Sequence, residues 1–151
     1  FKGEKWDTEL SPYLLPIVEW FEGRKLEVVA SEEVIVNLDV GFAGTSDVLF
    51  RYGRNGIGVF DLKSKKTVVG KQIDSYLEQK TQLAAYAATY FGEDRVEECL
   101  CANLFVSTTE PGRLDVVKAE RPARYWELFK HLCEVWRIAE DYDPRKVVAH
   151  A

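Results

Sequence analysis

Two apolar runs joined by a turn signal constrain the fold of this chain more than any other feature. Residues 40–51 and 57–64 have the β-branched and aromatic content of strands, and Asn55-Gly56 lies between them. Asn-Gly between two such runs is the strongest short-range signal for a β-hairpin. The sequence therefore predicts two adjacent antiparallel strands. Asp47 lies on the first of them, and Asp61 and Lys63 lie on the second.

The remaining chain alternates between helical and strand patterns. We expect helices over 11–22, 73–91 and 122–140, and further strands over 26–37, 99–107 and 114–119. A helix between two strands requires a crossover, so part of the sheet should be parallel. The pattern predicts a mixed α/β domain. In its last helix, five residues at helical spacing are expected in the core: Tyr125, Phe129, Leu132, Cys133 and Trp136.

Composition favours one packed domain over residues 1–151. The chain is 46% hydrophobic and 13% aromatic, and no apolar run is long enough to cross a bilayer, so no membrane partner is expected. It contains no methionine and opens at Phe1, so we expect the natural start, with part of the first helix, to lie upstream. Cys99, Cys101 and Cys133 lack metal-ligand spacing, which predicts reduced thiols in the cytoplasm or another reducing compartment.

Charge is distributed unevenly along the chain. The formal net charge is −5, which argues against a general polyanion binder. Residues 51–71 nevertheless hold six basic residues against the single acid Asp61, a local charge of +5. Such a patch could bind phosphates, although a solvated run of charges is the simpler alternative. Five of its members are candidate DNA contacts: Arg51, Arg54, Lys65, Lys66 and Lys71.

The hairpin predicts where its charged residues meet. A two-residue turn at Asn55-Gly56 would place roughly residue 64 opposite Asp47, and so Asp61 and Lys63 a few residues from Asp47. Two carboxylates brought together need a cation to neutralise them, and Mg²⁺ prefers such oxygen ligands. Lys63 emerges on the same face as Asp61 and could polarise a water or meet charge on a phosphate. The alternative is a surface salt bridge between Lys63 and one of the aspartates.

The helix predicted over 73–91 adds a polar row. Gln82 and Tyr86 are four residues apart and share one helix face, while alanines and Leu83 supply the face that packs on the sheet. A Gln and Tyr pair at this spacing is common by chance. It gains meaning only together with the hairpin residues.

Taken together, these residues resemble a known family. Gly44-Thr45-Ser46-Asp47 matches GxxD, Asp61-Leu62-Lys63 matches (D/E)xK, and the run from Gln82 to Tyr86 matches QxxxY. In this order and at these separations they resemble the RecB-like branch of the PD-(D/E)XK nucleases, and are most similar to phage-type exonucleases and the mitochondrial genome maintenance exonuclease. The resemblance covers roughly residues 28–91.

The resemblance implies a restriction-endonuclease-like core of αβββαβ order, with a mixed sheet flanked by helices. It implies that Asp47, Asp61 and the Leu62 carbonyl bind Mg²⁺ or Mn²⁺ and that Lys63 positions the hydrolytic water. Gln82 and Tyr86 would support the lysine and contact the strand. An upstream glutamate would complete the site. Glu32 is our candidate and Glu33 the near alternative, which strand alternation would place on the opposite face.

The chain also departs from that family. RecB-like members often carry a metal-binding histidine on the first helix, but the first histidine here is His131, and His150 lies near the end of the chain. Both are expected to be structural or solvated. The four-cysteine cluster of some relatives is absent too, so we expect no iron–sulfur cluster.

The function predicted from these residues is a metal-dependent exonuclease acting on DNA that is single-stranded or has free ends, in replication, recombination or repair. A structure-specific endonuclease on the same core is one alternative. A catalytically inactive, nuclease-like DNA-binding module is another, although the acids and the lysine are all present. An unrelated α/β domain with salt-bridged strands would need three motif matches by coincidence.

Overall fold

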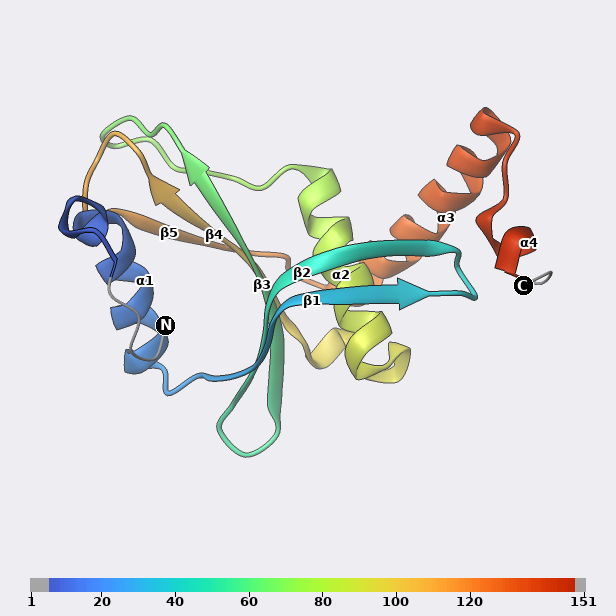
Figure 1. Ribbon diagram of the computed structural model, residues 1–151, viewed down its shortest axis with the longest axis horizontal. Coiled ribbons are helices and arrows are strands. Elements are labelled where there is room, and N and C mark those ends of the chain that lie inside the picture. The colour runs from blue at the N-terminus through green and yellow to red at the C-terminus, as the bar shows by residue number, and fades with distance from the viewer. Residues whose placement is uncertain (1–5, 149–151) are drawn as a thin grey trace.

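A five-stranded mixed sheet forms the centre of the protein, as given by a computed structural model that describes residues 6–148 (Figure 1). The strands lie in the order β1-β2-β3-β4-β5, and β3 and β4 are the parallel pair. The other three neighbouring pairs are antiparallel. The elements are η1 Thr8–Leu10, α1 Ser11–Gly23, β1 Glu27–Asn37, β2 Phe42–Tyr52, β3 Gly56–Lys65, α2 Leu77–Phe91, η2 Glu93–Glu98, β4 Leu100–Ser107, β5 Leu114–Lys118, α3 Pro122–Glu140 and α4 Pro144–Val148.

This architecture confirms the predicted α/β class with a mixed sheet flanked by helices. The parallel step occurs where α2 connects β3 to β4, as a helix between strands requires. Every helix and strand of at least five residues that the sequence predicts is present, apart from shifts at the ends. The largest shift is at α2, which starts at Leu77 because the Gln79 side chain accepts a hydrogen bond from the Tyr76 backbone N–H and caps the helix there.

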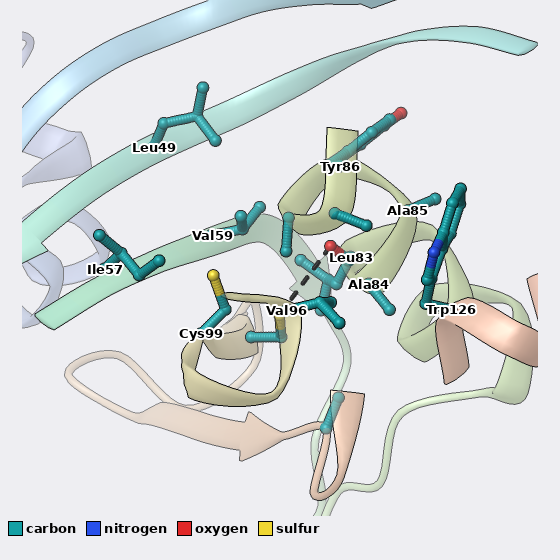
Figure 2. Close-up of a cluster of buried hydrophobic side chains, with 14 of the residues drawn as sticks. Leu49, Ile57, Val59, Leu83, Ala84, Ala85, Tyr86, Val96, Cys99 and Trp126 are labelled. Atoms are coloured by element: carbon teal, nitrogen blue, oxygen red, sulfur yellow. Dashed lines mark hydrogen bonds between the residues drawn. The ribbon is translucent and has the colours of Figure 1, made fainter. Parts of the chain in front are cut away.

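The two faces of the sheet bury different side chains. On one face, Leu49 and Val59 form a cluster with the alanine-rich side of α2, and Trp126 of α3 joins this cluster from the other side of that helix (Figure 2). On the other face, Phe50 stacks on Phe60 with ring centroids 4.0 Å apart, and α1 covers this pair through Trp20. β3 is thus buried on both sides, so a charged residue on it needs a specific partner.

The second half of α3 departs from the predicted core. Tyr125 and Phe129 pack against the core as expected, but Leu132 is 44% exposed and Trp136 is 48% exposed, while Cys133 is half-buried. The prediction was wrong for Leu132 and Trp136 because α3 continues past the sheet and α2, and the buried residue of its last turns is Arg137, which donates to the Val40 carbonyl (Figure 1). No helix in the described part of the chain is both long and apolar enough to span a membrane.

Candidate active site

The candidate site forms where β2 separates from β3. The two strands pair from Tyr52 opposite Gly56 to Val48 opposite Phe60. Beyond that point β2 stays with β1, which contacts α2, while β3 continues beside β4 (Figure 1). Asp47 and Asp61 are the next residues along each strand after the last pair. The strands therefore diverge at the two acids.

The loop of the hairpin sets this register, and it differs from the predicted turn. Tyr52 and Gly56 enclose three residues, so the loop is Gly53-Arg54-Asn55 rather than Asn55-Gly56. Gly53 takes the left-handed backbone conformation, with φ +57°, while Gly56 is the first residue of β3 and lies against the Tyr52 ring. The correction moves the register by three residues. It brings Asp61, instead of roughly residue 64, level with Asp47.

Hydrogen bonds tie all three residues of Asp61-Leu62-Lys63 into the site. The Leu62 backbone N–H donates to Asp47 Oδ2 at 2.7 Å. Lys63 Nζ donates to Asp61 Oδ1 at 2.9 Å, and Asn103 Nδ2 on β4 donates to Asp61 Oδ2 at 2.9 Å. Each carboxylate oxygen of Asp61 thus accepts one hydrogen bond. The Asp47 side chain accepts from the Leu62 backbone N–H, which has no backbone partner on β2 because the strands have separated.

The surroundings of Asp61 shift the pKa of its carboxyl in opposite directions. The residue is only 7% exposed, and this burial, reinforced by the charge of Asp47, raises the pKa of the Asp61 carboxyl above its ordinary value of 3.8 despite the contacts with Lys63 and Asn103. Burial alone would lower the pKa of Lys63, but Asp61, Asp47 and Tyr86 together raise it. Lys63 is therefore a cation at neutral pH.

Tyr86 on α2 contacts Gly44 on β2, three residues before Asp47. A β-carbon added at Gly44 would lie 2.5 Å from the Tyr86 hydroxyl oxygen, so only glycine leaves room for this tyrosine. Gln82 Nε2 donates to the same hydroxyl at 2.8 Å. Figure 2 shows the Tyr86 hydroxyl pointing away from the other labelled core side chains. The glycine of GxxD and the tyrosine of QxxxY are thus in direct contact, which sequence separation alone does not reveal.

The glutamates of β1 do not complete the carboxylate pair. Glu32 is exposed and has a left-handed backbone, with φ +52°, while Glu33 is half-buried and pairs with Ser46. Strict alternation therefore fails at Glu32. Over residues 6–148, no three His, Cys, Asp or Glu side chains come together as a metal site. Glu32 lies level with Asp47, between the pairs Ser31–Val48 and Glu33–Ser46, but its side chain is exposed, so its role in the site stays a prediction.

The basic residues of the predicted patch are separated by the strand that carries them. Arg51 and Arg54 lie at the hairpin loop, whereas Lys65 and Lys66 lie at the opposite end of β3. Ten residues of extended chain span about 30 Å. The expectation of one patch was wrong because charges that are close in the sequence are spread out along a strand. Of the five candidate DNA contacts, Lys65, Lys66 and Lys71 lie toward the same end of β3 as Lys63.

Arg113 fixes the loop that carries Lys66 and Lys71. Its guanidinium donates to the backbone carbonyls of Val68 at 3.2 Å and Lys71 at 2.6 Å. It also forms ion pairs with Glu110 and Asp115. The phosphate-binding candidates are therefore presented by a fixed turn. Nothing in the sequence pattern singled out Arg113, because Val68 and Lys71, whose carbonyls it bonds, are more than 40 residues away in the sequence.

Between residues 6 and 148, no histidine or cysteine belongs to this centre. His131 is exposed on α3, and His150 lies outside the described residues. Cys99 and Cys101 are buried, and burial raises the pKa of the Cys99 thiol to about 12. Both are inert thiols at neutral pH.

The carboxylate pair suits a divalent cation. Mg²⁺ is usually bound by one or two carboxylates with waters and phosphate oxygens, so Asp47 and Asp61 suffice in number and kind. With Lys63 between them they carry a net charge of −1. The Leu62 carbonyl lies on the Asp47 side of β3 together with its N–H, because both groups of an extended residue point to the same side. The donor set therefore fits the predicted ion.

No protein-family model matches this chain, and no curated protein sequence is significantly similar to it. The three short motifs lie on different elements, β2, β3 and α2, and their members meet at one place.

We predict that Gly44→Ala destabilises the protein through Tyr86. The added methyl group overlaps the tyrosine hydroxyl, and overpacking of this kind typically costs about 1–3 kcal/mol in the free energy of unfolding. Adding Tyr86→Phe to this variant should recover part of the loss, so the two changes should not be additive in urea denaturation. Gly23→Ala is the control, since nothing lies within 4 Å of its added carbon. Full additivity would contradict the contact.

We predict that Asp61→Asn changes the pH dependence of stability. Native Asp61 keeps its proton to a higher pH than the unfolded chain does, so raising the pH above about 4 disfavours the wild-type fold. In EDTA, the melting temperature of the variant relative to wild type should therefore rise between about pH 4 and pH 7 by calorimetry. Asp74→Asn should show no such rise, because Lys80 lowers the pKa of Asp74 and the stability that this carboxylate contributes is lost mainly below about pH 4. If the difference in melting temperature between Asp61→Asn and wild type did not change with pH, ionisation of Asp61 would not destabilise the native state.

Proposed function

We propose that this chain is a Mg²⁺- or Mn²⁺-dependent deoxyribonuclease of the RecB-like PD-(D/E)XK type, with a restriction-endonuclease-like core, that hydrolyses phosphodiester bonds at DNA ends. The observation that supports this most is the meeting of Asp47, Asp61 and Lys63 where β2 and β3 diverge, beside the Gly44–Tyr86 contact. A surface salt bridge would not need Asp61 to be buried, nor a second acid beside it.

The chain's own residues have distinct roles in this proposal. Asp47, Asp61 and the Leu62 carbonyl would hold the ion, which when bound supplies Lewis acidity to the phosphate and lowers the pKa of a bound water. Lys63 is held as a cation by Asp61 and is 39% exposed at its side chain, so it can meet the charge that develops on the attacked phosphate. Gln82 holds the Tyr86 hydroxyl, and Tyr86 lies near Lys63 and orients this end of the site.

The assay that tests this proposal uses end-labelled linear DNA and covalently closed circular DNA, each with Mg²⁺, Mn²⁺ or EDTA. Loss of label from linear DNA only, in metal and not in EDTA, is the expected result. Cutting of circles would replace the exonuclease with an endonuclease. Binding without cleavage in any metal would mean an inactive DNA-binding module.

We predict that Lys63→Ala abolishes cleavage but leaves DNA binding. Loss of a group that stabilises transition-state charge typically lowers the rate by about 100-fold or more, while Lys65, Lys66 and Lys71 still contact phosphate. Single-turnover cleavage and filter binding separate the two effects. Lys118→Ala, an exposed lysine at the end of β5, is the matched control and should cleave normally. A Lys63→Ala protein that degrades linear DNA at the wild-type rate in Mg²⁺ would reduce the motif to a structural ion pair.

We predict that the lysines and arginines of the 51–71 segment are not equivalent. Lys66→Ala and Lys71→Ala should each weaken DNA binding and reduce the slope of log K against log salt by about 0.7–0.9, because each removes one phosphate contact. Arg54→Ala should leave binding unchanged, since β3 places Arg54 at its far end. If Arg54→Ala and Lys66→Ala lost equal amounts of DNA affinity, the bound DNA would have to run along the whole length of β3.

A further inference from the structure

Asn103 is a polar residue in the middle of a buried strand. It lies on β4 directly across from Asp61 in the parallel register, and it is 1% exposed. Its residue neighbours on that face of β4, Cys101 and Phe105, are buried and apolar. The amide was the one strongly polar side chain in the predicted strand 99–107 before Ser107.

The hydrogen bonds of Asn103 are divided unequally. Nδ2 donates to Asp61 Oδ2 at 2.9 Å, while Oδ1 is buried and has no hydrogen-bond partner among the described residues. A buried amide that is only half satisfied costs free energy that an apolar side chain of similar size would avoid. Packing alone therefore favours leucine here, and the contact that accounts for an amide is the one with Asp61.

We propose that Asn103 is a positioning residue for the cation site, an inference that rests on the proposed function. Lys63 and Asn103 each hold one oxygen of Asp61, so the carboxylate cannot rotate about its own axis away from Asp47. An ionised carboxylate has about four lone-pair sites, and two donors leave capacity for a metal ion. Asn103 itself does not touch the ion. It lowers the cost of binding by fixing the ligand beforehand.

This role has a measurable signature in the absence of DNA. Groups that orient a metal ligand typically contribute about 10–100-fold to metal affinity. We expect Asn103→Leu to weaken Mn²⁺ binding to the metal-free protein by about that factor in isothermal titration calorimetry. Cys101→Val is the matched control, because it alters a buried side chain two residues away on the same face of β4 without touching Asp61. It should bind Mn²⁺ like wild type.

Cleavage kinetics distinguish positioning from damage to the fold. For Asn103→Leu, kcat should fall at low Mn²⁺ and recover as Mn²⁺ is raised, with KM for DNA unchanged, because only ion occupancy is affected. A defect in packing would in addition lower the melting temperature in EDTA, where no metal can stabilise the fold, so that measurement separates the two. If Asn103→Leu does not fold, Asn103→Ala, which lacks the donor without adding bulk, takes its place in the same measurements.

Each outcome has one meaning. Weaker Mn²⁺ binding by the Asn103 variant with normal binding by Cys101→Val supports the inference. Wild-type affinity in the Asn103 variant, in a wild-type protein that itself binds Mn²⁺ and cleaves DNA, overturns the role of Asn103 and leaves the proposed function intact. A wild-type protein that neither binds Mn²⁺ nor cleaves DNA overturns the proposed function, and this inference with it.

Discussion

Asp61 places a carboxylate inside a sheet that helices cover on both faces, and the surrounding structure has to compensate for it. Lys63 from the same strand and Asn103 from the parallel neighbour each bond one of its oxygens. Even so, burial and Asp47 keep the pKa of the Asp61 carboxyl above its ordinary value. An uncompensated second acid beside a buried one is costly, and a divalent cation relieves that cost. The chemistry that we propose thus follows from an electrostatic problem that the fold itself creates.

The separation of β2 from β3 makes this arrangement possible. Had the two strands continued to pair, the Leu62 N–H would have bonded to the backbone of β2, and the acids would have been closed within a continuous ladder. Instead the amide bonds to the Asp47 side chain. The hairpin of β1 and β2 then packs on α2, where Gly44 admits the Tyr86 ring. One change of strand direction therefore leaves the acids outside the β2–β3 backbone ladder and brings the helix residues to them.

The surface around the site has a consistent division of charge. The chain as a whole is acidic, with a net charge of −5, and lysines are concentrated where β3 ends, on a turn that Arg113 holds in place. A DNA backbone would be repelled by most of the acidic surface and attracted to the lysines at the end of β3. By contrast, the second half of α3 exposes apolar side chains, including Ile138 at 81%. Nothing in the described residues explains that exposure.

The sequence by itself determined the order and type of the five strands and of α1, α2 and α3, because hydrophobic periodicity, turn residues and caps are local. It also identified Asp47, Asp61, Lys63, Gln82 and Tyr86 as one group, through motif spacing. The tertiary structure decided what depends on register and on contacts between distant segments. A three-residue loop at Gly53 set the level of the two acids, and a left-handed Glu32 broke the alternation of β1. Pairing of β4 with β3 placed Asn103 against Asp61, and the length of β3 divided the basic residues. Each of these follows from long-range pairing of the backbone, which a linear pattern does not encode.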